Sequence, residues 1–273
     1  MKPPISPHHI DVPAEAMASD QPGGRVLLLP GSSGRANDIA QRFENRATFP
    51  SQRNHDVFLG TVPGANGPVD VGVVSTGMGC PSVDIIVTEL LSVGACCFLR
   101  VGTCGSLQSH VVRAGDVVIA TGAVRDEGAS LAYAPPEFPA VASGQVVSAA
   151  LAAAGASSFG DRVHVGVVHT KDSLYAREFG LGPAATENER YMERLSALGV
   201  LASEMEAAHL FVLAQVHSGT GVRARACRVH AGCVLAVIGG AVPFDGEVEA
   251  ADAVDRVIDL GLTTAARLPD MLG

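Results

Sequence analysis

The chain has 273 residues, a formal net charge of −9, 47% hydrophobic residues and no tryptophan. This length suits a single α/β domain with a large core, and the acidic balance argues against a general nucleic-acid-binding surface. No charge-free run reaches the roughly 18 residues that a membrane span needs, and residues 1–20 lack the apolar segment of a secretion signal. We therefore expect a cytoplasmic protein that binds neither nucleic acid nor membrane.

Apolar runs alternate with amphipathic segments along the chain, after an irregular arm at residues 1–23. Strands are predicted near 25–30, 57–62, 69–76, 97–101, 116–124, 163–169, 200–202 and 232–238. Helices are predicted at about 35–46, 82–93, 145–154, 187–198, 205–217 and 248–268. Continuous apolar strands between helices favour a three-layer α/β/α fold around a central mixed, largely parallel sheet. No repeat or linker divides the chain, so we expect one domain over residues 24–273.

The stretch from Arg100 to Ser106, RVGTCGS, directly follows an apolar run that should be a buried strand. The planar guanidinium and the Thr103 hydroxyl are good partners for a phosphate group. Gly102 and Gly105 allow backbone N–H groups to approach a ligand closely. Taken alone, such a turn is equally well explained as a plain crossing from strand to loop.

Two further loops carry arginines that suit the same anion. The segment from Gly31 to Arg35, GSSGR, lies between a predicted strand and a predicted helix, where backbone amides and the helix dipole favour an anion. It matches neither the P-loop nor the dinucleotide fingerprint. Arg53 precedes a predicted strand and, by itself, is typical of a solvated surface arginine. Together, Arg35, Arg53 and Arg100 form a candidate phosphate site.

The segment from Ser203 to Ala207, SEMEA, places two carboxylates on either side of a methionine at a predicted strand–helix junction. An acidic first helical turn complements the helix dipole, which is one explanation of this pattern. The alternative is functional: a carboxylate accepts from sugar hydroxyls while Met205 packs against the sugar face.

The six cysteines form no CxxC pair and show no His/Cys spacing typical of zinc. We therefore expect no metal site, and reduced, mostly buried thiols. Cys104, beside the candidate phosphate loop, is interpreted as a small packing residue rather than a nucleophile.

In their order along the chain, these motifs resemble the nucleoside phosphorylase-I family, and most closely its uridine phosphorylases. The resemblance covers roughly residues 9–260 and is carried by PGSSGR at 30–35, STGMGCPS at 75–82, FLRVGTCGSLQ at 98–108, the long segment at 115–142, KDSLY at 171–175 and EMEAA at 204–208. The family transfers a ribosyl group reversibly between a base and inorganic phosphate. The resemblance thus implies a pentosyltransferase with the nucleoside phosphorylase-like fold, with phosphate as co-substrate and no cofactor.

The resemblance also implies the parts of the site. The implied phosphate-binding residues are Gly31, Arg35, Arg53, Arg100 and Thr103. The implied ribose-binding residues are His9, Thr103, Glu204, Met205 and Glu206. The expected base-binding residues are Cys104, Gly105, Leu174, Arg177, Glu178 and Ile238. Arg100 and Glu206 are the expected catalytic residues; they act by fixing phosphate and sugar hydroxyls, so no covalent nucleophile is needed.

The same resemblance implies a homo-oligomer. Arg53 and His9 match family residues that complete the site of a neighbouring subunit, so the arm at residues 1–23 should contribute to that neighbour. We expect a dimer as the minimal active unit, and a hexamer as the full assembly.

The choice of base is defined by departures from the family pattern. Uridine phosphorylases usually present a Gln and an Arg in the loop that here spans 176–183 and has no Gln. Arg177 and Glu178 could replace them, Glu178 accepting from a base N–H; a solvated loop pair is the alternative. Purine-preferring relatives have an Asp where this chain has Ile238, so a purine leaving group would lack its acid. We expect uridine and related pyrimidine nucleosides as substrates, and the alternatives are a purine or broad-specificity phosphorylase, a nucleoside hydrolase and a non-catalytic nucleoside-binding protein.

Overall fold

The computed structural model describes residues 6–156, 162–218, 228–239 and 247–273, and of residues 247–250 the backbone alone. The strands are β1 (Val26–Leu29), β2 (Glu44–Phe49), β3 (Val57–Gly64), β4 (Gly67–Val74), β5 (Cys97–Ser106), β6 (Val117–Asp126), β7 (Ala140–Val141), β8 (Val163–Lys171), β9 (Ala202–Glu204) and β10 (His230–Gly239). The helices are α1 (Ala14–Met17), α2 (Ser33–Ala40), α3 (Cys80–Ser92), the 3₁₀ turn η1 (Ala129–Ala132), α4 (Gly144–Gly155), α5 (Leu174–Phe179), α6 (Ala185–Ala197), α7 (Ala207–Ser218) and α8 (Glu247–Leu272).

All the described strands belong to one mixed sheet with the order β10-β6-β8-β9-β5-β1-β4-β3-β2, and β7 pairs with β6. Strand β10 also pairs in parallel along β5, so the path from β10 through β6, β8 and β9 returns to β5 and closes a ring. The expected α/β fold with a central mixed sheet is confirmed. The sheet is more evenly mixed than the sequence indicated, because the β3–β4, β2–β3, β5–β9 and β10–β6 pairings are antiparallel.

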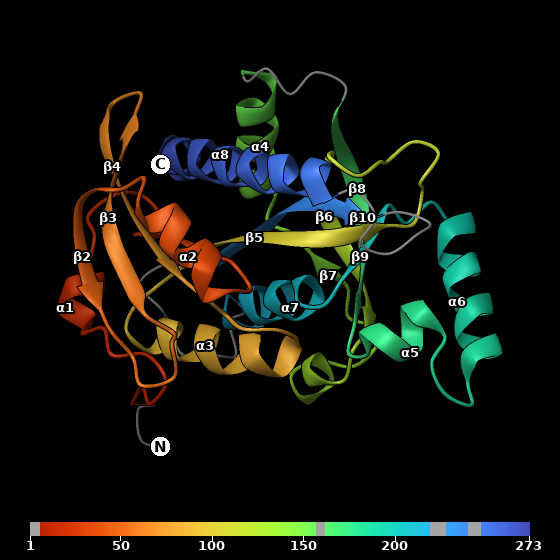
Figure 1. Cartoon of the computed structure of the whole chain (residues 1–273). Coiled ribbons are helices and arrows are strands. Elements are labelled where there is room, and N and C mark those ends of the chain that lie inside the picture. Colours follow the sequence, from red (N-terminus) through yellow and green to blue (C-terminus); the bar gives the residue numbers. More distant parts are fainter. Residues whose placement is uncertain (1–5, 157–161, 219–227, 240–246) are drawn as a thin grey trace.

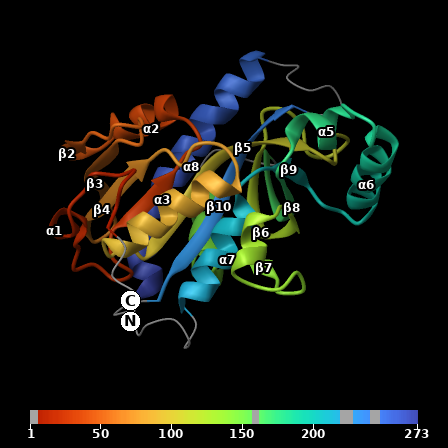
Figure 2. The same ribbon diagram turned by 90° about the horizontal axis from the view of Figure 1, so that it is seen from below.

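The sheet is buried on both faces, as its continuous apolar strands predict. In Figure 1, α4 and α8 lie on one side of β5, and α3 and α7 lie on the other. Along β1 the side chains alternate: Val26 and Leu28 join the core beneath α2, α4 and α8, whereas Leu27 and Leu29 join the core beneath α3 and α7. Figure 2 shows α3 and α7 side by side over this second face.

Three predicted elements differ from the structure. The stretch from Arg100 to Ser106, interpreted as a turn after a strand at 97–101, lies within β5 itself. The helix expected up to residue 46 ends at Ala40, and residues 44–49 form the exposed edge strand β2 on β3. The segment lacks an apolar stripe, so backbone pairing decides its conformation. The loop expected at 176–183 begins with helix α5, because the Ser173 hydroxyl accepts from the Ala176 N–H and Gly180 ends the helix in the left-handed region at φ 63°.

The N-terminal arm packs on its own chain from residue 9 onward. Ile10, Val12 and Met17 are buried in the core with α3. The buried Glu89 carboxylate on α3 accepts from the backbone N–H groups of His9, at 2.8 Å, and Ile10, at 3.1 Å. These contacts hold residues 9 and 10 against α3 of the same chain.

Four cysteines are buried free thiols, as expected: Cys80, Cys97, Cys104 and Cys233. Cys96 is disulfide-bonded, so the expectation of reduced thiols is wrong at that position. Cys227 lies outside the described residues. Within the described ranges, none of the helices has the length and apolar character needed to cross a membrane.

Candidate active site

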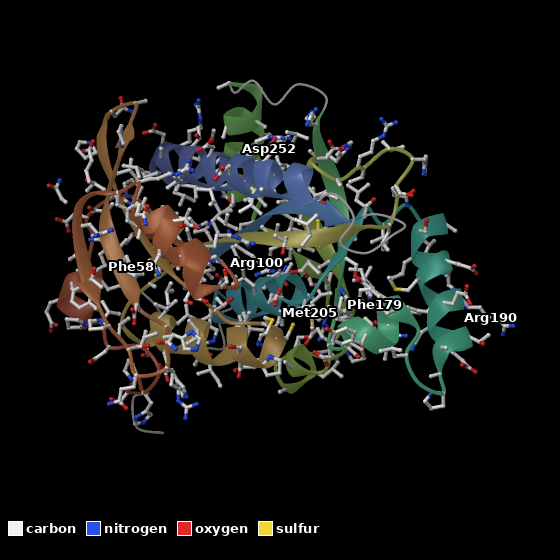
Figure 3. The ribbon with its side chains drawn as sticks, in the orientation of Figure 1. Phe58, Arg100, Phe179, Arg190, Met205 and Asp252 are labelled. Carbon is white, nitrogen blue, oxygen red and sulfur yellow. The ribbon has the colours of Figure 1, made fainter. Side chains whose placement is uncertain are left out.

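A cavity of about 660 Å³ opens where the carboxyl-terminal half of β5 meets the loops before α2, α3 and α7. Helices α5 and α6 and the end of β10 complete its wall. All the predicted site residues line this cavity except His9, Arg53 and Arg177. In the view of Figure 3, Met205 lies between Arg100 and Phe179, two other residues of the wall.

Arg100 is a buried cation of the site, held by two carboxylates. The residue is 5% exposed, and its Nε donates to Glu204 at 3.0 Å while its Nη2 pairs with Glu206. Burial alone would lower the pKa of Arg100, but Glu206 and Glu204 outweigh it, so the pKa is raised and the guanidinium stays charged. Its Nη1 is buried without a hydrogen-bond partner in the described part of the chain. The guanidinium therefore keeps donor capacity that its two carboxylates do not use.

Arg35 lies next to Arg100 at the N-terminus of α2. The helix is capped by the Ser32 hydroxyl, which accepts from the Arg35 N–H, and Gly31 precedes the cap. The Arg35 Nη1 donates to the Val101 carbonyl at 3.4 Å. Burial and then the nearby Arg100 charge lower the pKa of Arg35. A buried and a half-buried guanidinium group that repel each other beside a helix N-terminus favour an anion between them.

Glu206 connects this charged cluster to the loop before α3. The residue is buried; Oε1 accepts from the Gly79 N–H at 2.6 Å, and Oε2 pairs with Arg100. Gly79 has φ 83°, a conformation that favours glycine. Burial raises the pKa of Glu206, Arg100 opposes this, and Glu204 adds to it. Each carboxylate oxygen keeps a further lone pair that can accept from a hydroxyl.

Glu204 has a different set of partners. Its carboxylate accepts from the Arg100 Nε, from the Thr170 hydroxyl and from the backbone N–H groups of Glu206 and Ala207 at 2.9 Å each. It therefore caps α7 and holds Arg100 at the same time. These four contacts use the carboxylate's acceptor sites, so Glu204 has no lone pair to spare for a sugar hydroxyl in this structure.

Strand β5 supplies the floor of the cavity through Thr103, Cys104 and Gly105. The Cys104 thiol donates to the Ala236 carbonyl at 3.6 Å, and burial raises its pKa well above the usual range. A protonated, buried thiol is a poor nucleophile, which agrees with the interpretation of Cys104 as a packing residue.

The part of the cavity beside α5 carries a second pair of charges. Glu178 Oε1 lies 2.6 Å from the Lys171 Nζ, and the lysine also donates to the Ser203 hydroxyl at 2.8 Å. Leu174 and Phe179 provide apolar walls on either side of Glu178 in sequence. The arrangement offers a fixed acceptor in a mostly apolar pocket, which is a typical way to read one edge of a flat ring.

Arg177 does not reach the cavity, which corrects its expected role at the base. Its guanidinium pairs with Asp126 at 2.7 Å, donates to Asn188 at 2.6 Å and stacks 4.5 Å over the Tyr191 ring. On the short helix α5, neighbouring residues point in different directions, so Glu178 faces the cavity while Arg177 faces α6.

His9 and Arg53 also lie outside the cavity of their own chain. The His9 Nδ1 lies 2.7 Å from the Glu89 carboxylate, which holds the ring on the α3 surface. Arg53 is exposed on the loop between β2 and β3. Neither position contradicts a role in a neighbouring subunit, and that role stays a prediction.

Sequence reasoning missed several residues of the wall. Lys171, Ser203, Phe179, Met192 and Met78 all line the cavity. Lys171 begins the segment KDSLY and Ser203 begins the segment SEMEA, and the chain has one other lysine, at position 2. A lysine at the end of an apolar strand, in a chain with only two lysines, was therefore the feature of the sequence that could have indicated Lys171 as a site residue. Met78 lies in the segment STGMGCPS at 75–82, one of the motifs that carry the resemblance, and Met192 carried no signal. Among the described residues, no cluster of three or more His, Cys, Asp or Glu side chains is arranged to hold a metal ion.

Comparison with known proteins places the chain in one family. The family model described as "Phosphorylase superfamily" matches residues 25–268. The uridine phosphorylase of Treponema pallidum (strain Nichols) is 41% identical over 79% of this chain and 78% of its own length. The guanosine phosphorylase of Halorubrum lacusprofundi is 34% identical over 89% of this chain and 93% of its own, and the uridine phosphorylase of Escherichia coli (strain K12) is 36% identical over 71% and 76%. The chain belongs to the phosphorylase superfamily, which confirms the resemblance indicated by its motifs.

Proposed function

We propose that the protein catalyses the reversible phosphorolysis of uridine to uracil and ribose 1-phosphate. The observation that carries the proposal is the cluster of Arg35, Arg100 and Glu206 in one cavity, where cationic groups and a buried carboxylate meet. Uridine phosphorylases among the relatives, at 34–41% identity, support the same reaction.

Phosphate is the nucleophile in the proposed reaction. Arg35, Arg100, Thr103 and the backbone at Gly31 hold it, and its oxygen attacks the anomeric carbon as the C–N bond breaks. The bonding electrons leave with the base, which takes up a proton. The entering phosphate also supplies negative charge beside the positive charge that develops on the sugar.

The sugar lies over Met205, with Glu206 accepting from its 2′- or 3′-hydroxyl. Glu206 is suited to this because Arg100 and the Gly79 N–H hold the carboxylate in place while a lone pair on each oxygen stays open. Glu204 acts one step back: it orients Arg100 and caps α7 rather than touching the ribose.

The base lies against Cys104, Gly105, Leu174 and Ile238, with Glu178 as the polar contact. Ile238 offers no proton to the leaving group, which favours pyrimidines. A purine-specific phosphorylase is the second candidate, because the Halorubrum guanosine phosphorylase matches 89% of this chain.

The site is completed by a second subunit that lends His9 and Arg53, so the minimal active unit is a dimer, and dimers associate to a hexamer. Two features support the proposal that a second subunit covers the cavity. Both residues lie outside their own cavity, and Met78, on the cavity wall, is 84% exposed in the single chain.

Product analysis tests the proposal. Uridine, inosine and guanosine are each incubated with and without inorganic phosphate, and base and sugar products are separated. We expect uridine cleavage that requires phosphate and yields ribose 1-phosphate. Free ribose in phosphate-free buffer would indicate a hydrolase, and faster turnover of inosine or guanosine would favour the purine candidate.

A further inference from the structure

Lys171, at the end of β8, is a buried ammonium group beside the proposed base site. The residue is 2% exposed, and its Nζ contacts Glu178 Oε1 at 2.6 Å, the Ser203 hydroxyl at 2.8 Å and the Glu204 carbonyl at 3.4 Å. The contacts with Ser203 and Glu204 are hydrogen bonds, whereas the contact with Glu178 is an ion pair whose Oε1 accepts no hydrogen bond from the described residues. The Lys171 ammonium is therefore surrounded by protein groups, and a substrate would contact the Glu178 carboxylate rather than the ammonium itself.

A chain of hydrogen bonds fixes Lys171 from behind. Ser203 accepts from Lys171, so its own proton is directed to His169 Nδ1, 3.0 Å away. His169 then presents its Nε2 proton to Asp126 at 2.9 Å, and Arg177 pairs with the same carboxylate. Along this series of hydrogen bonds, from Lys171 through Ser203 to His169, each proton has one acceptor. The network explains why Arg177 faces away from the cavity, because its guanidinium pairs with Asp126, the last acceptor of the network.

The front of the network is the Glu178 carboxylate. Lys171 holds Oε1, while Oε2 is on the side of Gly105, where a Cβ built on that glycine would come within 3.9 Å of it. Both residues line the cavity, and the Glu178 side chain keeps 20% exposure. An ionised carboxylate accepts hydrogen bonds and donates none. A base entering the cavity beside Glu178 and Gly105 therefore meets an acceptor held in one place.

We propose that Lys171 is a positioning residue for base recognition: it fixes Glu178 as an acceptor for the ring N–H of a base with a –CO–NH– edge. Uracil carries such an N–H at N3, whereas cytosine presents a lone pair at that position and repels a carboxylate. The inference rests on the proposed phosphorolysis and adds the chemical rule that selects the base. It applies equally to 6-oxopurines, which carry the same –CO–NH– edge.

A substrate panel tests the rule. The value of kcat/KM is measured with phosphate for uridine, 3-methyluridine and cytidine, and for inosine against adenosine. We expect uridine to exceed both 3-methyluridine and cytidine by about 10²-fold or more, because a hydrogen-bonding site rejects analogues that leave it unpaired. Cytidine turnover equal to that of uridine would overturn the inference and leave the proposed function intact. Turnover of inosine alone, with adenosine rejected, would overturn the uridine assignment and leave the inference intact.

A double-mutant cycle tests Lys171 itself. K171M should raise the KM for uridine by about 10- to 100-fold, with the KM for phosphate and the rate on 3-methyluridine changed less than about threefold. In an E178Q background the same change should have little further effect, since Lys171 acts through Glu178. K171Q serves as the second variant if K171M does not fold. The control is R42M, which removes an exposed pair with Asp255 and Asp259 on α8.

The outcomes separate positioning from structure. If K171M slows uridine and 3-methyluridine equally, or if the two substitutions multiply in the double variant, Lys171 has only a structural role and the inference is wrong. Loss of the preference for uridine over 3-methyluridine in K171M, with the phosphate KM unchanged, supports it.

Discussion

Replacing Arg100 by lysine tests whether its guanidinium holds the proposed phosphate. In the structure Nε and Nη2 are used by Glu204 and Glu206, and Nη1 has no partner among the described residues. Lysine keeps the positive charge that these buried carboxylates need, but it lacks the planar fork that serves three acceptors in different directions. The substitution therefore removes donor geometry while it retains the charge.

The expected magnitude follows from that geometry. One hydrogen bond to a charged group contributes about 1.5–3 kcal/mol, so losing the contact to phosphate should lower kcat/KM by about 10²-fold. R100A should lose at least as much activity. It should also lose about 3–5 kcal/mol of stability, because two buried carboxylates would be left without their counter-charge. The difference between the two variants separates catalysis from folding.

The assay is steady-state phosphorolysis with uridine and phosphate varied independently, together with thermal unfolding of each variant. The control is R25K, since Arg25 is half-buried and donates to the Gly60 and Val71 carbonyls outside the cavity. We expect R25K to retain its phosphate KM. If R100K kept both kcat/KM and phosphate KM within about threefold of the wild-type values, Arg100 would not hold the nucleophile.

Three other predictions follow from neighbouring residues. E206Q should slow uridine turnover by roughly 30- to 1000-fold, corresponding to about 2–4 kcal/mol, and a change in melting temperature with unchanged kinetics would assign Glu206 to structure alone. Mixing R53A and R100A chains should recover activity through heterodimers that contain one intact site, whereas verified subunit exchange without recovery would exclude a shared site. The hydrogen bond from His209 lowers the pKa of Asp84, so Asp84 stabilises the fold above its unfolded pKa of about 3.9 and loses that contribution as pH falls through its lower folded pKa. Denaturant unfolding should thus show the stability gap between wild type and D84N shrinking from pH 6 toward pH 3, and a constant gap would contradict this.

The sequence predicted the interior of the fold better than its edges. Strand β1 and the first half of β5 were predictable because both faces of the sheet are buried there, so their residues form continuous apolar runs. In β1, every side chain from Val26 to Leu29 is apolar and buried. Strand β2 was not, because its exposed side chains carry no period and only the pairing with β3 makes it a strand. Helix α5 is short and depends on a serine cap and a left-handed glycine rather than on an apolar stripe.

The site divides in the same way. Arg100 was indicated by the residues themselves, because a charge that follows a buried strand needs a partner. Arg35 and Glu206 were implied by the resemblance of the motifs that carry them. Arg177 and Glu178 were indistinguishable in sequence, since two adjacent charged residues in a loop give no sign of which one faces the cavity. Only the partners on other elements, Asp126 for the arginine and Lys171 for the glutamate, separate their roles.

The distribution of charge along the cavity gives a physical reason for these two roles. In the proposed reaction negative charge enters with phosphate beside Arg35 and Arg100 and leaves on the base beside Glu178. A free carboxylate near the leaving base would oppose that development of charge. The Lys171 ammonium, 2.6 Å from Glu178, balances this carboxylate, so the pair can accept a base N–H without adding net negative charge to that end of the cavity. At the other end Arg100 and Arg35 face Glu204 and Glu206, so these four charges sum to zero. An incoming phosphate is therefore bound through guanidinium N–H groups that have no partner among the described residues, on Arg100 Nη1 and Arg35 Nε, rather than by surplus positive charge.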